Sequence, residues 1–117
     1  MSDIQRAGTT RRYSDFCVHN GVVHCVEVPP DARADISTQT AQMLESLERF
    51  LIAAGSSKDR LLMATLYLVD MADYAAVNAV WDAWVPEGTA PCRACVQVVR
   101  LADPGWRVEV AIQAALG

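Results

Sequence analysis

The segment Arg60–Val69 constrains the fold most, because its sequence RLLMATLYLV is apolar on both faces of an extended strand. A strand of this kind has to be covered on both faces. Apolar residues with helical spacing occur over Asp35–Ala54 and again in the segment that begins at Asp70. Two helices cover one face of a sheet, so we expect the other face to be buried by a second copy of the chain.

The remaining strands are predicted from β-branched residues and turn signals. Phe16–His19 and Val22–Val28 flank Asn20-Gly21, a strong signal for a two-residue hairpin turn. Two further strands are predicted towards the C-terminus, which gives the order β-β-α-β-α-β-β. The pattern leaves open a short extra strand near residues 4–7. We therefore predict one α+β domain over residues 1–117, a mixed sheet with two helices packed on one face.

The last two predicted strands carry polar groups in an apolar setting. In Pro91–Val98, Arg93 and Cys95 share one face while Val96 lies on the other; Val108–Gln113 places Glu109 opposite its valines. A buried cation or carboxylate is costly unless something pairs with it. This cost points to a small-molecule site.

Composition narrows the function classes. The chain of 117 residues has a net charge of −4 and a pI of about 5.0, which disfavours nucleic-acid binding. No apolar run is long enough to span a bilayer, and the N-terminus lacks an apolar signal region, so a cytoplasmic location is expected.

The four cysteines are expected to be thiols. Cys92 and Cys95 match a C-x-x-C pattern, but residues three apart on a strand face opposite ways and do not chelate one metal. Cys17, His19 and His24 share one face of the predicted hairpin and form a weak metal-binding pattern without a fourth ligand. We therefore expect no metal site.

Three segments follow one another in a recognisable order. The first runs from Gln39-Thr40 through Gly55-Ser56 to Thr65, and the second is DMADYAAVN, Asp70–Asn78. The third is PCRACVQV, Pro91–Val98, followed by the Val-Glu-Val of residues 108–110. Together these segments resemble the YjgF/Rid family of reactive intermediate deaminases, and the similarity extends from about Tyr13 to the C-terminus.

The resemblance implies a chorismate-mutase-like α+β fold that assembles as a homotrimer with clefts between subunits. It implies hydrolysis of 2-imino or 2-enamine acids, such as 2-aminoacrylate or 2-iminobutanoate, to 2-keto acids and ammonia. The ligands are then small imino and keto acids, and the resemblance implies no cofactor.

Arg93 and Glu109 are the predicted catalytic residues. The planar guanidinium of Arg93 suits a substrate carboxylate, and Glu109, expected on the adjacent strand, positions the attacking water. The alternatives are structural: an ion pair between these two residues, or one between Glu109 and Arg107.

The resemblance adds four substrate-binding candidates. Cys95 is expected to shape the pocket, Tyr13 to line the cleft, and Asn78 matches a helix asparagine of the family, although packing roles remain open for each. Cys25 is a candidate because Cys25-Val26-Glu27 stands where many members have Ser-Gly-Gln.

Two other functions compete with hydrolysis. A non-catalytic protein that binds carboxylates for regulation would use the same intersubunit pocket. An RNA-directed activity, described for some relatives, is disfavoured by the acidic chain, which has no basic stripe.

Overall fold

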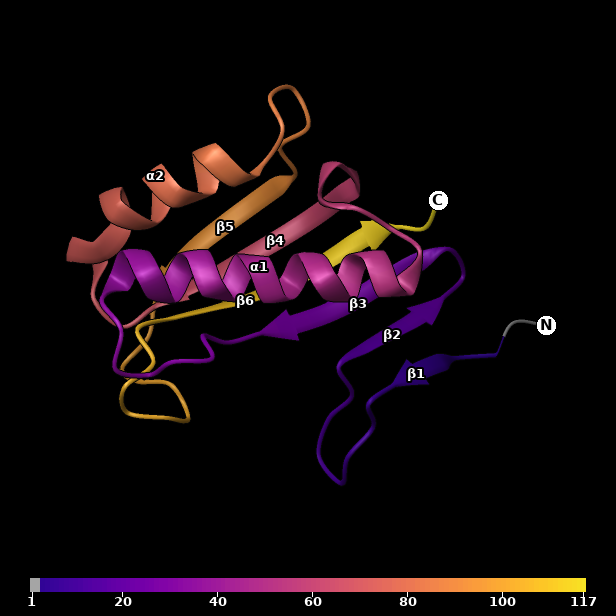
Figure 1. The fold of residues 1–117 in the computed structure, drawn as a ribbon, viewed down its shortest axis with the longest axis horizontal. Coiled ribbons are helices and arrows are strands. Elements are labelled where there is room, and N and C mark those ends of the chain that lie inside the picture. Colours follow the sequence, from indigo (N-terminus) through magenta and orange to yellow (C-terminus); the bar gives the residue numbers. More distant parts are fainter. Residues whose placement is uncertain (1–2) are drawn as a thin grey trace.

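Two helices lie against one face of a six-stranded mixed sheet in the computed structural model, which describes residues 3–117 (Figure 1). The strand order is β1-β2-β3-β6-β4-β5, and only β4 and β5 run parallel. The strands are β1 (Gln5–Ala7), β2 (Phe16–His19), β3 (Val22–Glu27), β4 (Leu61–Leu68), β5 (Cys92–Gln97) and β6 (Val108–Ala115), and the α-helices are α1 (Ile36–Ala54) and α2 (Tyr74–Trp84). The predicted fold is confirmed, with β1 as the extra strand.

The hairpin between β2 and β3 forms at the predicted turn. Asn20 has φ 50° and Gly21 has φ 78°, the left-handed values that a type I′ turn requires at both positions. The resulting register pairs Cys17 with His24. At the sheet edge, β1 pairs antiparallel with β2.

Helix α1 begins and ends at the residues that its sequence indicates. The Asp35 carboxylate accepts a hydrogen bond of 2.8 Å from the Thr38 backbone N–H, which satisfies one free donor of the first turn. Gly55 ends the helix at φ 91°, a left-handed conformation that favours glycine. No helix within residues 3–117 is long and apolar enough to cross a membrane.

The start of α2 differs from the prediction. Asp70 caps a short 3-10 helix, η2 (Met71–Asp73), by accepting from the Ala72 N–H, and the α-helix begins only at Tyr74. The Asp73 side chain makes no cap hydrogen bond. The Asp73 carboxylate forms a bidentate ion pair with the Arg107 guanidinium, and the shorter distance is 2.7 Å between Arg107 Nη2 and Asp73 Oδ1. Arg107 lies in the loop before β6, and the spacing of residues along the sequence does not predict that this loop lies next to Asp73.

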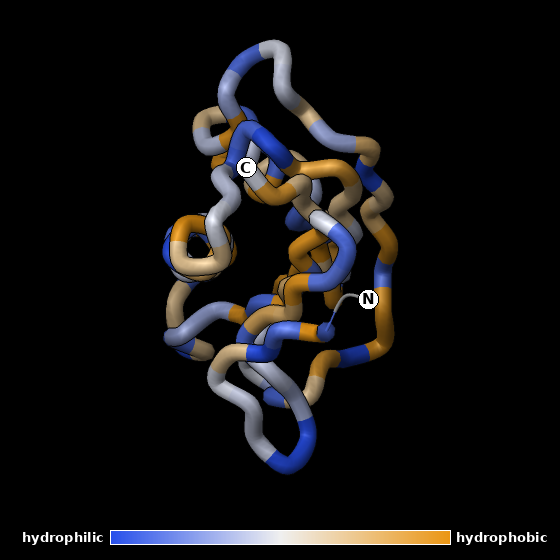
Figure 2. The backbone as a smooth tube through the Cα atoms, turned by 90° about the vertical axis from the view of Figure 1, so that its right-hand side faces the viewer, coloured by the Kyte–Doolittle hydropathy of each residue, from blue (hydrophilic) through white to orange (hydrophobic). Residues whose placement is uncertain are grey.

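Strand β4 is covered by the helices on one face only. Its buried face belongs to the core, which consists of residues from β2, β3, β4, β6 and both helices together with Val85 directly after α2: Val18, Val23, Cys25, Met43, Leu44, Leu47, Leu51, Leu61, Ala64, Leu66, Leu68, Val77, Trp81, Val85, Val108, Val110, Ile112 and Ala114. Figure 2 shows α1 end-on to one side of the strands. The opposite side of the sheet, here called the open face, carries His24, Val26, Met63, Thr65, Tyr67, Val96, Glu109, Ala111 and Gln113, none of them fully buried.

The buried Gln39 of α1 joins two loops beside the sheet, the one before α1 and the one before β6. The Gln39 amide group donates to the carbonyls of Ala34 (3.1 Å) and Gly105 (2.9 Å), with a longer contact of 3.4 Å to Ala32. Its carbonyl oxygen accepts from the Arg107 N–H at 2.8 Å. These bonds satisfy backbone groups that neither helix nor sheet serves, and they hold the loop that enters β6.

Replacing Gln39 by Met keeps the side-chain volume and leaves those backbone groups without partners. We expect the free energy of unfolding to fall by about 2–4 kcal/mol, measured by urea denaturation at pH 7. Gln42→Met is the control, because the buried Gln42 Oε1 has no hydrogen-bond partner within residues 3–117. Its stability should stay within about 0.5 kcal/mol of wild type; equal losses in both variants would contradict the assigned role of Gln39.

Candidate functional site

The guanidinium of Arg93 is held by three side chains of α2. Arg93 Nη2 donates to Asn78 Oδ1 at 2.8 Å and to the Tyr74 hydroxyl at 3.4 Å. The guanidinium carbon lies 5.3 Å from the Trp81 ring centroid and 5.9 Å from that of Tyr74, within cation–π range. Arg93 therefore points to the helix side of the sheet with its orientation set by uncharged groups.

No carboxylate in the described part of the protomer compensates the positive charge of Arg93. None of the ion pairs within residues 3–117 includes Arg93, and its buried Nη1 has no acceptor there. A buried charged donor without a partner is destabilising. An anion with two oxygens, such as a carboxylate, matches the geometry of a guanidinium.

Glu109 lies in a hollow on the open face. The hollow has a volume of about 420 Å³ and is lined by Tyr13, Ser14, Asp15, Val26, Glu27, Val28, Ala102, Trp106 and Glu109. Burial raises the pKa of the Glu109 carboxyl. Tyr13 is 64% exposed at the rim. The lining of the hollow thus combines three acidic residues, Asp15, Glu27 and Glu109, with aromatic and aliphatic ones.

Arg93 and Glu109 do not lie on adjacent strands, contrary to the prediction. Strand β4 separates β5 from β6, and in this register Arg93 aligns with Ala64, whereas Glu109 aligns with Tyr67. Ala64 belongs to the buried core, so Arg93 and Glu109 occupy opposite faces of the sheet. The error came from pairing the last two strands with each other, whereas β6 is inserted between β3 and β4.

Neither structural alternative for Glu109 forms within residues 3–117 of one protomer. Arg93 is across the sheet, and Arg107 is paired with Asp73. None of the ion pairs within residues 3–117 includes Glu109. Each of the two predicted catalytic side chains therefore has no charged partner among the described residues of its own protomer.

The cysteine candidates have different environments. Cys95 is half-buried on the Arg93 side and packs against the core; burial raises its pKa, and Arg93 opposes that shift. Cys25 is a core residue whose thiol donates to the Asp15 carbonyl at 3.2 Å. Burial, followed by nearby Glu27, raises the pKa of the Cys25 thiol to about 12. The Cys25 thiol thus faces the core and not the Glu109 hollow.

The hairpin pattern forms no metal site. Residues 3–117 contain no group of three or more histidine, cysteine, aspartate or glutamate side chains that could hold a metal ion. All four cysteines are free thiols.

Sequence reasoning missed two residues that hold Arg93. Tyr74 and Trp81 belong to the apolar spacing of the segment that begins at Asp70, and that spacing by itself predicts only packing against the sheet. They stand four residues before and three residues after Asn78, so the three side chains share one helix face. A polar asparagine within an aromatic stripe was the available signal.

Fold and site together define an α+β protein with an anchored arginine that has no counter-ion among residues 3–117. The chain matches the family model described as endoribonuclease L-PSP over residues 4–116. A RutC family protein from Haemophilus ducreyi is 41% identical over 114 residues, 97% of either chain. The RutC family protein YoaB from Escherichia coli K12 is 41% identical over 113 residues, covering 97% of this chain and 98% of YoaB.

Solved structures agree with these matches. A YjgF family protein from Neisseria meningitidis superposes with a TM-score of 0.93 at 46% identity, covering 98% of this chain and 96% of that one. The chain therefore belongs to the YjgF family, also called Rid, RutC or L-PSP.

Thiol labelling tests the placement of Cys25. Because the thiolate is the reactive form, we expect Cys25 to stay unmodified by iodoacetamide in the native protein at pH 8. In urea-unfolded protein it should be modified together with the other cysteines, as peptide mass spectrometry would show. Rapid modification of Cys25 in the native protein would place its thiol in an accessible site.

Proposed function

We propose that this protein hydrolyses reactive 2-imino and 2-enamine acids to 2-keto acids and ammonia. The observation that carries the proposal is the uncompensated Arg93 guanidinium, oriented by Asn78, Tyr74 and Trp81. A 2-imino acid carries the carboxylate that this cation lacks, beside the C=N carbon that reacts. Membership of the YjgF family and the resemblance to its deaminases support the same activity.

The reaction needs orientation more than strong activation, because imines are intrinsically labile. Arg93 binds the substrate carboxylate and fixes the C=N carbon. Glu109 orients a water whose oxygen attacks that carbon, and a proton from the water passes to the nitrogen. Collapse of the resulting carbinolamine breaks the C–N bond, which releases ammonia and leaves the 2-keto acid. Only water is consumed.

Two copies of the chain supply the two halves of the proposed site. Arg93 and Glu109 lie on opposite faces of one sheet, so a single protomer cannot bring both to one substrate. Their charges are opposite, and neither side chain forms an ion pair within residues 3–117 of its own protomer. The open face also exposes apolar side chains, among them Val26 and Val96, that a second copy would cover. In the homotrimer that the resemblance implies, Arg93 of one protomer approaches the Glu109 hollow of its neighbour.

A coupled assay tests the activity. A threonine dehydratase generates 2-iminobutanoate in the presence of semicarbazide, which traps the imine. We expect the wild-type protein to lower the amount of trapped imine, and Arg93→Ala to reduce this effect about 100-fold through loss of the carboxylate contact. Arg49→Ala, which removes an exposed arginine from α1, should retain full activity.

The outcomes separate three functions. Binding of 2-ketobutyrate without turnover would select the non-catalytic carboxylate-binding protein. Salt-sensitive RNA binding without imine hydrolysis would select the activity named in the family model; the net charge of −4 disfavours it. High residual activity in Arg93→Ala would remove Arg93 from the mechanism.

Mixing inactive variants tests the composite site. Arg93→Ala and Glu109→Gln protomers are each expected to form inactive homotrimers. In any mixed ring of three, one interface joins an intact Arg93 to an intact Glu109. Unfolding and refolding an equal mixture should therefore restore about a quarter of the wild-type activity, given random assembly. Refolded single variants are the controls, and no recovery in the mixture would contradict a site shared between protomers.

A further inference from the structure

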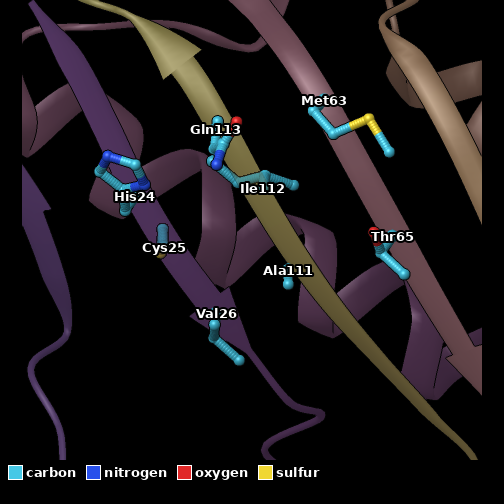
Figure 3. Close-up of a pocket in the computed structure, with 8 residues that line it drawn as sticks. All are labelled: His24, Cys25, Val26, Met63, Thr65, Ala111, Ile112 and Gln113. Atoms are coloured by element: carbon cyan, nitrogen blue, oxygen red, sulfur yellow. The ribbon is translucent and has the colours of Figure 1, made fainter.

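Val26 stands between two hollows on the open face and lines both. One is the Glu109 hollow. The second has a volume of about 220 Å³, is shown in Figure 3, and is lined by His24, Cys25, Val26, Met63, Thr65, Ala111, Ile112 and Gln113. The Val26 side chain is 53% exposed, so it is free of the core and available to a ligand.

The strand register explains why a single side chain separates the two hollows. Val26 pairs with Ala111 in the antiparallel β3–β6 ladder, and His24 pairs with Gln113 two residues further along. Glu109 lies two residues from Ala111 in the other direction, on the same face. Because Ala111 has only a methyl group, the branched Val26 side chain forms the partition, and its χ1 angle has little freedom.

The same register sets the length available to a substrate side chain between Glu109 and the Val26–Ala111 pair. Residues two apart on a strand are separated by about 7 Å, so a substrate carbon over Glu109 lies about that far from the Val26–Ala111 pair. Carbon atoms in contact stay about 3.5–4 Å apart, which leaves about 3 Å, the extent of a two-carbon side chain. A longer side chain directed along the groove meets the Val26 methyl groups.

We propose that Val26 limits the length of the substrate side chain in this protein. The inference rests on the proposed function and adds the substrate class to it: 2-imino acids with short aliphatic side chains. Without the Val26 methyl groups the two hollows become one groove that continues past Ala111 to His24 and Gln113. The shortened variant then accepts the branched imino acid derived from leucine.

The test compares side-chain lengths in one assay. An L-amino-acid oxidase, with catalase present, generates the imines of alanine, 2-aminobutyrate and leucine, and semicarbazide traps whatever is not hydrolysed. We expect wild type to prefer the two short imines. Val26→Ala should raise the kcat/KM ratio of the leucine imine to the 2-aminobutyrate imine at least about tenfold.

A matched control comes from the same strand. Val22 is a half-buried valine four residues earlier that lines neither hollow, and Val22→Ala should leave the ratio unchanged. Size-exclusion chromatography checks that the variants keep the wild-type assembly. An unchanged ratio in an assembled Val26→Ala protein would overturn the proposal.

A binding arm separates failure of this inference from failure of the proposed function. Titration calorimetry with 2-ketobutyrate and 4-methyl-2-oxopentanoate measures the same selectivity without turnover. If wild type hydrolyses no imine, the deaminase function fails, while a gain of at least about tenfold in relative affinity for the longer acid in Val26→Ala still supports the length limit. If neither hydrolysis nor binding selectivity responds to Val26→Ala, the inference is wrong.

Discussion

The insertion of β6 between β3 and β4 is the constraint on which the rest of the structure depends. It places the valines of β6 in the buried core beside β4, and it leaves β5 at the sheet edge, paired only with β4. From that position Arg93 reaches α2, while Glu109 faces the opposite side. The topology thus divides the charged groups of one chain between two faces, and a function that needs both groups needs two copies of the chain.

Arg93 stays available to bind an anion because the groups around its guanidinium are uncharged. Asn78 and two aromatic rings hold the guanidinium without neutralising it. Arg107, the residue directly before β6, instead forms a bidentate ion pair with the Asp73 carboxylate. The two arginines show how the same side chain serves binding or stability. The paired guanidinium of Arg107 joins the loop before β6 to the start of α2. The unpaired guanidinium of Arg93 retains its affinity for an anion.

The open face combines two roles in the proposed assembly. Its apolar side chains favour contact between copies, and its hollows at Glu109 and His24 are positions for a small ligand. Val26 belongs to both roles, since it is an exposed apolar residue and the partition between the hollows. A change at this position is therefore expected to alter ligand size as well as the surface available to a neighbour.

Local signals in the sequence determined the elements and their ends: the Asn20-Gly21 turn, the Gly55 cap, and the two-faced apolarity of Arg60–Val69. Alternation within β5 also placed Arg93 and Cys95 on one face. Strand order was decided only in the tertiary structure, because backbone pairing between distant segments leaves no periodic trace in either strand. For that reason the partners of Asp73, the core position of Cys25 and the separation of Arg93 from Glu109 could not be predicted. Each of these features depends on which strands pair with β6, and the packing of the whole sheet decides that pairing.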